Sequence, residues 1–121
     1  MDKMGRLKSV IQRLKSARGI KIAILFGSQA NGRARKDSDV DICIIGDNEE
    51  AEMKALEYAS EEIDISAFSR LPLYVQYRVF KNGRMIFNKD DKLLTKAKFW
   101  TITRYLDEKY WRDKFTKRVL S

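Results

Sequence analysis

The chain has 121 residues with a net charge of +8, one Cys and no His. That length suits one domain with its own core, and the missing His excludes Ser-His-Asp and Cys-His nucleophile pairs. A single Cys without His also excludes an internal disulfide and a closed structural zinc site. Any catalysis must therefore use carboxylates, Lys, Tyr, hydroxyl groups or bound ions.

The first part of the chain predicts a helix followed by two strands. Apolar residues recur at helical spacing over residues 2–17, and Gly19 is a suitable residue to stop that helix. Residues 20–26 (IKIAILF) are apolar and rich in branched side chains, as is typical of a buried strand. After the polar stretch QANGRARKDS, residues 39–45 (DVDICII) predict a second strand, which a turn follows.

The rest of the chain alternates helices and strands. Residues 49–60 predict a helix with acidic residues in its first turn, and residues 63–68 predict a third strand. Pro72 can open a helix that runs to about residue 80. A fourth strand is predicted over residues 84–87, and a long helix follows over about 91–119.

This order of elements predicts the α+β class, with a small mixed sheet flanked by helices. We expect one domain over residues 1–121, with a catalytic core over about 20–87. On the last helix, Leu94, Ala97, Thr101 and Tyr105 share one side. The aromatic residues of that helix are expected to lie mostly in the core, with some on a partner surface: Phe99, Trp100, Tyr105, Tyr110 and Trp111.

The termini and hydropathy predict a soluble cytoplasmic protein. The basic start MDKMGRLKSV is not followed by an apolar stretch, so no signal peptide is expected. No window reaches the ~20 apolar residues that a membrane span needs. The single thiol, Cys43, is expected to be a small buried hydrophobe in a reducing compartment.

The net charge hides an uneven distribution. Residues 1–36 carry a net charge of +9, residues 37–64 carry −10, and residues 65–121 carry +9. A chain that coats nucleic acid would not be expected to have such an acidic centre. The pattern instead indicates a cation site in the middle of the chain, with basic flanks that attract an anionic ligand.

Three carboxylates are the candidates for that cation site. Asp39 and Asp41 are two residues apart on a predicted strand, so their side chains project to one face. Neighbouring carboxylates repel unless a cation neutralises them, and oxygen ligands without His or Cys favour Mg²⁺ or Mn²⁺. Asp64, alone between two Ile residues, could reach the same site from a neighbouring strand and accept a proton from an attacking hydroxyl group.

Gly27 and Ser28 form the complementary half of the candidate site. A Gly directly after a buried strand permits a tight turn and a close approach of ligand to backbone. Backbone N–H groups after that turn, together with the Ser28 hydroxyl, are suited to hold phosphate. Phosphoryl and nucleotidyl transfer need this combination of a phosphate cradle and charge neutralisation.

These residues carry a family resemblance. Gly27-Ser28, ten residues and then Asp39-Val40-Asp41 resemble the GSx10DxD signature of the DNA polymerase beta-like nucleotidyltransferases. In length and strand context the chain resembles the minimal nucleotidyltransferase (MNT) proteins, the antitoxin partners of HEPN-domain toxins. The similarity covers roughly residues 20–87. The chain departs from the pattern at Asn31, where many relatives have Arg.

The resemblance implies a specific enzyme activity. It implies an ATP held by Gly27 and Ser28, and metal ions held by Asp39 and Asp41. It also implies that Asp64 takes part in catalysis at that metal site. The implied reaction transfers AMP from ATP to a tyrosine hydroxyl of a partner HEPN toxin and releases pyrophosphate, so the protein would act as an antitoxin.

Other interpretations stay open at this level. Asp39 and Asp41 could be a turn-capping acid and an edge-strand charge, and Asp64 could pair with a Lys or Arg. Gly27-Ser28 could be only a strand-to-helix turn. Two other functions are a non-enzymatic antitoxin that neutralises its partner by contact and, with less support, a nucleic-acid-binding protein.

Overall fold

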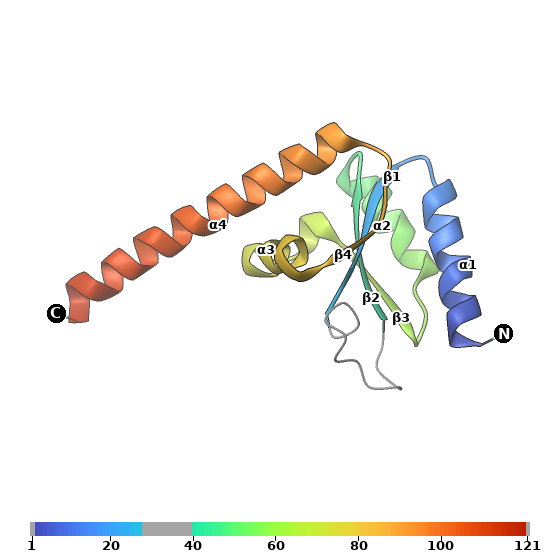
Figure 1. Cartoon of the computed structure of the whole chain (residues 1–121), viewed down its shortest axis with the longest axis horizontal. Helices are drawn as coiled ribbons and strands as arrows, with labels where there is room; N and C mark the ends of the chain where they lie inside the picture. Colours follow the sequence, from blue (N-terminus) through green and yellow to red (C-terminus); the bar gives the residue numbers. More distant parts are fainter. Residues whose placement is uncertain (1, 28–39, 121) are drawn as a thin grey trace.

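The computed structural model describes residues 2–27 and 40–120, and the predicted order of elements is confirmed (Figure 1). Short 3₁₀ turns, η1 (Leu56–Tyr58) and η2 (Phe68–Arg70), follow α2 and β3. The helices and strands are, in order, α1 (Lys3–Ser16), β1 (Ile20–Phe26), β2 (Val40–Gly46), α2 (Glu49–Ala55), β3 (Ile63–Ala67), α3 (Leu73–Asn82), β4 (Arg84–Asn88) and α4 (Asp91–Leu120).

The four described strands form one mixed sheet in the order β3-β2-β1-β4. Strand β1 is antiparallel to both β2 and β4, whereas β2 and β3 are parallel. Helices cover both faces, with α1 and α2 on one side and α3 and the start of α4 on the other (Figure 1). The predicted α+β class, a mixed sheet flanked by helices, is confirmed.

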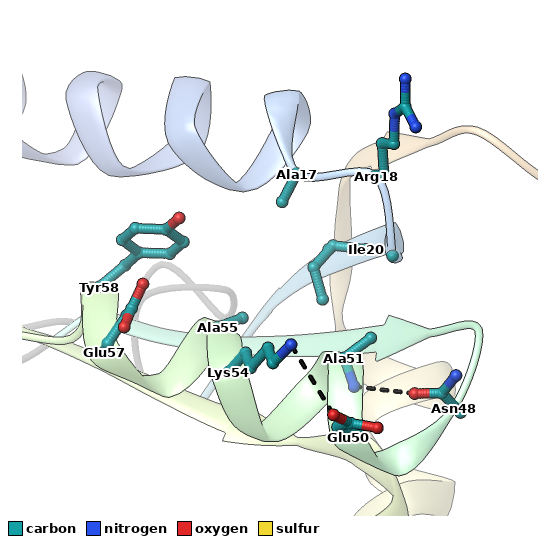
Figure 2. Close-up of a pocket in the computed structure, with 11 residues that line it drawn as sticks. Ala17, Arg18, Ile20, Asn48, Glu50, Ala51, Lys54, Ala55, Glu57 and Tyr58 are labelled. Carbon is teal, nitrogen blue, oxygen red and sulfur yellow. Dashed lines mark hydrogen bonds and ion pairs between the residues drawn. The ribbon is translucent and has the colours of Figure 1, made fainter.

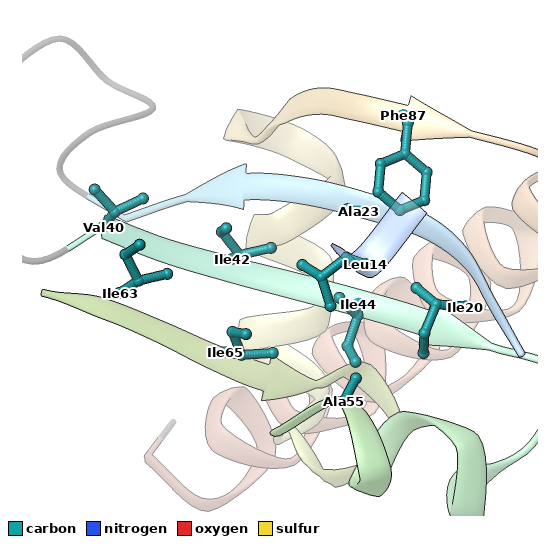
Figure 3. Close-up of a cluster of buried hydrophobic side chains, with 10 residues drawn as sticks. All are labelled: Leu14, Ile20, Ala23, Val40, Ile42, Ile44, Ala55, Ile63, Ile65 and Phe87. Carbon is teal, nitrogen blue, oxygen red and sulfur yellow. The ribbon is translucent and has the colours of Figure 1, made fainter. Parts of the chain in front are cut away.

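The first face of the sheet holds the larger core cluster. Branched side chains from β2 and β3 pack beneath Leu14 of α1 and Ala55 of α2 (Figure 3). Alternation along the strands sends these residues to one face because successive side chains point to opposite sides. The cluster consists of Leu14, Ile20, Ala23, Val40, Ile42, Ile44, Ala55, Ile63, Ile65 and Phe87.

The second face holds a smaller cluster beneath α3 and α4. Its buried members are Ile22, Ile24, Cys43, Ile45, Phe68 and Val79, and Leu94 and Ala97 of α4 pack against them. Cys43 is completely buried, as expected, and burial raises the pKa of its thiol far above the usual value. The thiol is therefore part of the core and not a nucleophile.

The predicted role of Gly19 as a helix stop is wrong. Helix α1 ends at Ser16, and Ala17, with an extended backbone, is its C-cap. Gly19 lies beyond the cap, where an added Cβ would come within 2.6 Å of the Cβ of Ala51. Glycine is therefore required there for the close approach of the chain to α2, not for ending the helix.

Helix α2 is fixed by a buried carboxylate that the sequence pattern did not single out. Glu52 accepts hydrogen bonds from the backbone N–H of Gly46 and of Ser69, each at 3.1 Å, and from the Ser69 hydroxyl at 2.7 Å. Its side chain is only 4% exposed, so these donors compensate for its removal from water. Glu52 thereby joins α2 to the end of β2 and to η2.

Most aromatic residues of the last helix are not in the core. Phe99, Trp100, Tyr110 and Trp111 are all more than half exposed, so the expectation that they are mostly core residues is wrong. Tyr105 is half-buried and stacks on Tyr77 of α3, with ring centroids 3.9 Å apart. No helix within the described ranges is both long enough and apolar enough to cross a bilayer.

Candidate functional site

Three of the predicted site residues meet at one edge of the sheet. Phe26, the last residue of β1, lies opposite Asp41 of β2, and Asp41 lies opposite Asp64 of β3. Gly27 follows Phe26 directly, so it ends β1 beside Asp41. The chain thus brings together residues from positions 27, 41 and 64 through strand pairing alone.

Gly27 is in a conformation that favours glycine. Its φ angle is +79°, in the left-handed region where a Cβ is strained. A Cβ at this position would lie 2.5 Å from Oδ2 and 3.3 Å from Cγ of Asp41. The absence of a side chain therefore lets the Asp41 carboxylate lie directly against the turn that ends β1.

Asp41 and Asp64 point to the same face of the sheet. Asp41 and Cys43 are two residues apart on β2, so their side chains point to the same face of the sheet. Cys43 belongs to the cluster under α3 and α4. Asp64 alternates with Ile63 and Ile65, which belong to the cluster on the opposite face. Since Asp41 and Asp64 are register partners on strands about 4.8 Å apart, their side chains start from adjacent positions on this face.

The two carboxylates differ in their surroundings. Asp41 is half-buried, whereas Asp64 is exposed although both of its chain neighbours are buried. Within residues 2–27 and 40–120, no ion pair or side-chain hydrogen bond joins Asp64 to another residue. The alternative interpretation of Asp64 as the partner of a Lys or Arg therefore has no support from the described residues.

Donor chemistry at this edge fits a hard divalent cation. Magnesium is usually bound in such sites by one or two carboxylates together with water and substrate phosphates. Asp41 and Asp64 supply two carboxylates, and the described residues contain no group of three or more His, Cys, Asp or Glu that could hold a metal. Two further predicted residues, Ser28 and Asp39, lie outside the described residues, as does Asn31.

A contact between distant residues supports the start of β3. Arg6 of α1 pairs with Glu62, and its Nε donates to Oε2 of Glu62 at 2.8 Å. The backbone carbonyl of Glu62 accepts from the N–H of Val40 at 2.9 Å. Glu62 therefore links α1 to the residues next to both Asp41 and Asp64. No local pattern in the sequence indicates that the partner of Glu62 lies 56 residues away.

A separate hollow with polar residues in its lining is at the other end of the sheet. A cavity of about 420 Å³ lies between the end of α1 and the face of α2 (Figure 2). Ile20 at the start of β1 and Asn48 after β2 line it, together with Arg18, Lys54, Glu57 and Tyr58. Ile20 pairs with Gly46 at the opposite end of these strands from Asp41, so the cavity is separate from the candidate site.

Comparisons of sequence identify a family and a relative. Residues 8–92 match the family described as Polymerase beta, Nucleotidyltransferase. A protein of Methanocaldococcus jannaschii, provisionally named a protein adenylyltransferase, is 34% identical over 96 residues. The aligned region covers 79% of this chain and 72% of that relative.

Comparisons of structure agree on the fold. A chain from a crystal structure of a toxin–antitoxin with AMP-PNP superposes with a TM-score of 0.69, at 15% identity over 99% of this chain and 100% of that one. A chain from the tri-AMPylated HEPN toxin of Shewanella oneidensis in complex with MNT antitoxin gives a TM-score of 0.65, at 15% identity over all of both chains. At these identities the likeness shows a shared fold.

Proposed function

This chain belongs to the polymerase beta nucleotidyltransferase family, and we propose that it transfers AMP from ATP to a tyrosine hydroxyl of a partner HEPN-domain toxin. In this proposal the protein is an adenylyltransferase that acts as an antitoxin. The observation that carries it is the pairing of Asp41 with Asp64 at the edge where Gly27 ends β1. Because ATP is the substrate, we expect the activity in the cytoplasm.

The proposed reaction is an in-line displacement at the α-phosphorus of ATP. The tyrosine oxygen forms a bond to that phosphorus, the bond to the β-phosphate oxygen breaks, and pyrophosphate leaves. The hydroxyl proton needs an acceptor close to the attacking oxygen. Asp64 is suited to this role because it is exposed and lies beside Asp41.

Asp41 and Asp64, with Asp39 as a further predicted ligand, would hold Mg²⁺, or Mn²⁺ in its place. A bound divalent cation would neutralise charge on the triphosphate and orient the leaving group. The Asp41 carboxylate lies against the turn at Gly27, in the space that a side chain at position 27 would fill. Ser28 and the backbone after Gly27 are the predicted phosphate contacts.

A protein acceptor is supported by the relatives. The name of the Methanocaldococcus relative gives a protein as the acceptor, and one structure of the same fold contains a HEPN toxin carrying AMP. Another structure of the same fold is a toxin–antitoxin with an ATP analogue. We extend these properties to this chain, with ATP as the donor of AMP and a HEPN-domain toxin as the acceptor.

Substitution of Asp41 tests the proposal. Asp41→Asn keeps the size of the side chain and removes the charge, so label transfer from ATP to the HEPN-domain protein should fall by about 100-fold or more. The measurement mixes the two purified proteins with Mg²⁺ and ATP labelled in the α-phosphate, and mass spectrometry locates AMP on the acceptor. Asp64→Asn should give a comparable loss.

A matched control is available just after the same strand. Asp47 is an exposed carboxylate just beyond the other end of β2, 4.0 Å from Lys21. Asp47→Asn makes the same chemical change away from the site and should retain full transfer. Full transfer by Asp41→Asn would refute the proposed site. If Asp41→Asn transfers no AMP yet still neutralises the toxin, neutralisation occurs by contact and the adenylyl transfer is not its cause.

A further inference from the structure

The second half of α4 extends beyond the rest of the molecule (Figure 1). Every residue from Leu106 to Leu120, called here the distal arm, is exposed. At about 1.5 Å per residue the arm is about 22 Å long. Its large apolar side chains are at least half exposed, which is costly unless another surface covers them: Leu106, Tyr110, Trp111, Phe115, Val119 and Leu120.

One face of the arm continues the face by which α4 packs on the body. Ala97, Thr101 and Tyr105 of α4 are buried or half-buried, and Tyr105 stacks on Tyr77 of α3. A helix returns to within about 40° of the same direction after 14 residues. The residues 14 positions later are Trp111, Phe115 and Val119. Large apolar side chains thus repeat the pattern of a helix-covered face where α3 no longer reaches.

The face also has a local recess with a charged rim. A hollow of about 150 Å³ is lined by Trp111, Phe115, Lys114 and Arg118. The Lys114 ammonium lies 5.2 Å from the ring centroid of Tyr110 and 6.0 Å from that of Trp111. An apolar side chain of a partner would fit between the rings of Trp111 and Phe115. An acidic residue next to it would meet the cations of Lys114 and Arg118.

Charge on the arm selects against a second copy of this chain. The arm contains five Lys or Arg and three Asp or Glu, a net charge of +2, and its last twelve residues, 109–120, carry +4. Pairing two such segments would bring like charges together, whereas an acidic surface would be attracted. The charge therefore favours a different, acidic partner.

We propose that the distal arm is the docking segment for the acceptor protein, which covers Trp111, Phe115 and Val119 with an acidic amphipathic helix. This inference rests on the proposed function. The arm leaves the layer of helices on the face of the sheet to which Asp41 and Asp64 point. A partner held by the arm is thereby retained on the side of the sheet where its hydroxyl is needed, which raises the local concentration of the acceptor.

Substitutions to Glu on the two opposite faces of the arm test the docking segment. Phe115→Glu and Trp111→Glu place an acid on the proposed face, whereas Leu106→Glu makes the same kind of change about 140–180° around the helix. All three side chains are at least half exposed, so the variants are expected to fold. The probe is the purified HEPN-domain protein used for the transfer assay, and the affinity is measured by isothermal titration calorimetry.

We expect Phe115→Glu and Trp111→Glu to weaken binding by about 30-fold or more, as for a central interface residue, and Leu106→Glu to change it by less than about threefold. Unchanged binding by both proposed-face variants, or a greater loss for Leu106→Glu, would overturn the inference. No binding by the unaltered chain would do the same.

Two further measurements exclude other occupants. A dimer of the isolated chain in light scattering, lost in Phe115→Glu, would show that the arm binds a second copy. Binding to vesicles that contain an anionic lipid, lost in the same variant, would show a membrane surface instead, since basic helices with aromatic residues also bind lipid. Either result would replace the proposed partner.

The docking inference and the proposed function fail differently. If Asp41→Asn binds the HEPN-domain protein normally but transfers no AMP, and Phe115→Glu loses both, the two proposals stand together. If the unaltered chain binds through Phe115 but transfers no AMP, only the proposed function is refuted. If Phe115→Glu binds and transfers AMP normally while Asp41→Asn is inactive, only the docking segment is refuted.

Discussion

Gly27 shows how a single backbone position shapes the candidate site. Its positive φ and the 2.5 Å distance from an added Cβ to Oδ2 of Asp41 are two independent reasons for glycine. The sequence predicts the turn from the Gly-Ser pair after an apolar strand. It does not predict that the atom which a side chain would displace belongs to Asp41, because that contact depends on the pairing of β1 with β2.

Gly27→Ala should therefore impair both stability and activity. The strained φ and the displaced carboxylate should lower the free energy of unfolding by about 1–3 kcal/mol. Transfer of AMP should fall further than stability explains, because Asp41 must move. Urea denaturation and the labelled-ATP assay, performed well below the unfolding midpoint, separate the two effects.

Gly5→Ala is the matched control for that substitution. Gly5 lies inside the first turn of α1, where its N–H bonds to Oδ1 of Asp2 at 2.7 Å. Alanine in a helix should raise stability by up to about 1 kcal/mol and leave transfer unchanged. Equal behaviour of Gly27→Ala and Gly5→Ala would contradict the strain assigned to the turn.

Two acidic residues show what residue type alone cannot decide. Asp64 is exposed on β3 without an ion pair among the described residues, whereas Glu52 is buried and accepts three hydrogen bonds. The pattern of Asp64 between two Ile residues correctly drew attention to it. Glu52 lies in an acidic helix and resembles its exposed neighbours in sequence, so only the packing of α2 against η2 reveals its structural role.

At the scale of elements, α4 has two parts with different environments. Leu94, Ala97 and Thr101 contact or lie within the body, whereas all residues from Leu106 onward are exposed. The helical periodicity is continuous through both parts, so the sequence predicts one long helix. It cannot show where the cover by α3 ends, and for that reason the expectation of a mostly buried set is wrong for Tyr110 and Trp111 of the arm.

Removal of the distal arm should leave the fold intact. A chain that ends at Tyr105 loses only exposed residues, so its free energy of unfolding should change by no more than about 0.5 kcal/mol. Urea denaturation followed by circular dichroism measures this. Binding to the HEPN-domain protein should be lost.

A shorter chain provides the contrast. A chain that ends at Asp90 also loses Leu94 and Ala97, which pack on the second core cluster, and should be severely destabilised. If truncation at Tyr105 unfolds the protein, the arm contributes to folding and its description as an unsupported extension is wrong.

At the scale of the whole molecule, the sheet separates two helical layers and holds the chain's one thiol at its centre. Cys43 is fully buried in β2, and burial raises the pKa of the thiol. Only the thiolate reacts with disulfide reagents, so the folded protein should be unreactive at neutral pH. Labelling should be at least about 1,000-fold slower than in the unfolded chain, since reaction requires global opening.

A thiol-reactive dye with and without urea measures this protection. Because the chain has one Cys, a single rate reports the opening of both layers. The rate should increase with urea in parallel with loss of the circular dichroism signal. Rapid labelling in the absence of urea would show that the region around β2 opens separately from the rest of the fold.

The sequence by itself determined the element order and the fold class and predicted the residues of the candidate site, because periodicity and motif spacing are local properties. Asp41 and Asp64 were predicted to act together, and strand register places them side by side; for Ser28 and Asp39, which lie outside the described residues, the assigned roles stay predictions. Tertiary structure alone decided that Gly27 contacts Asp41, that Glu52 is buried, and that α4 extends past its cover. Each of these depends on which surfaces meet in space, and residues far apart in the chain carry no local signal of that meeting.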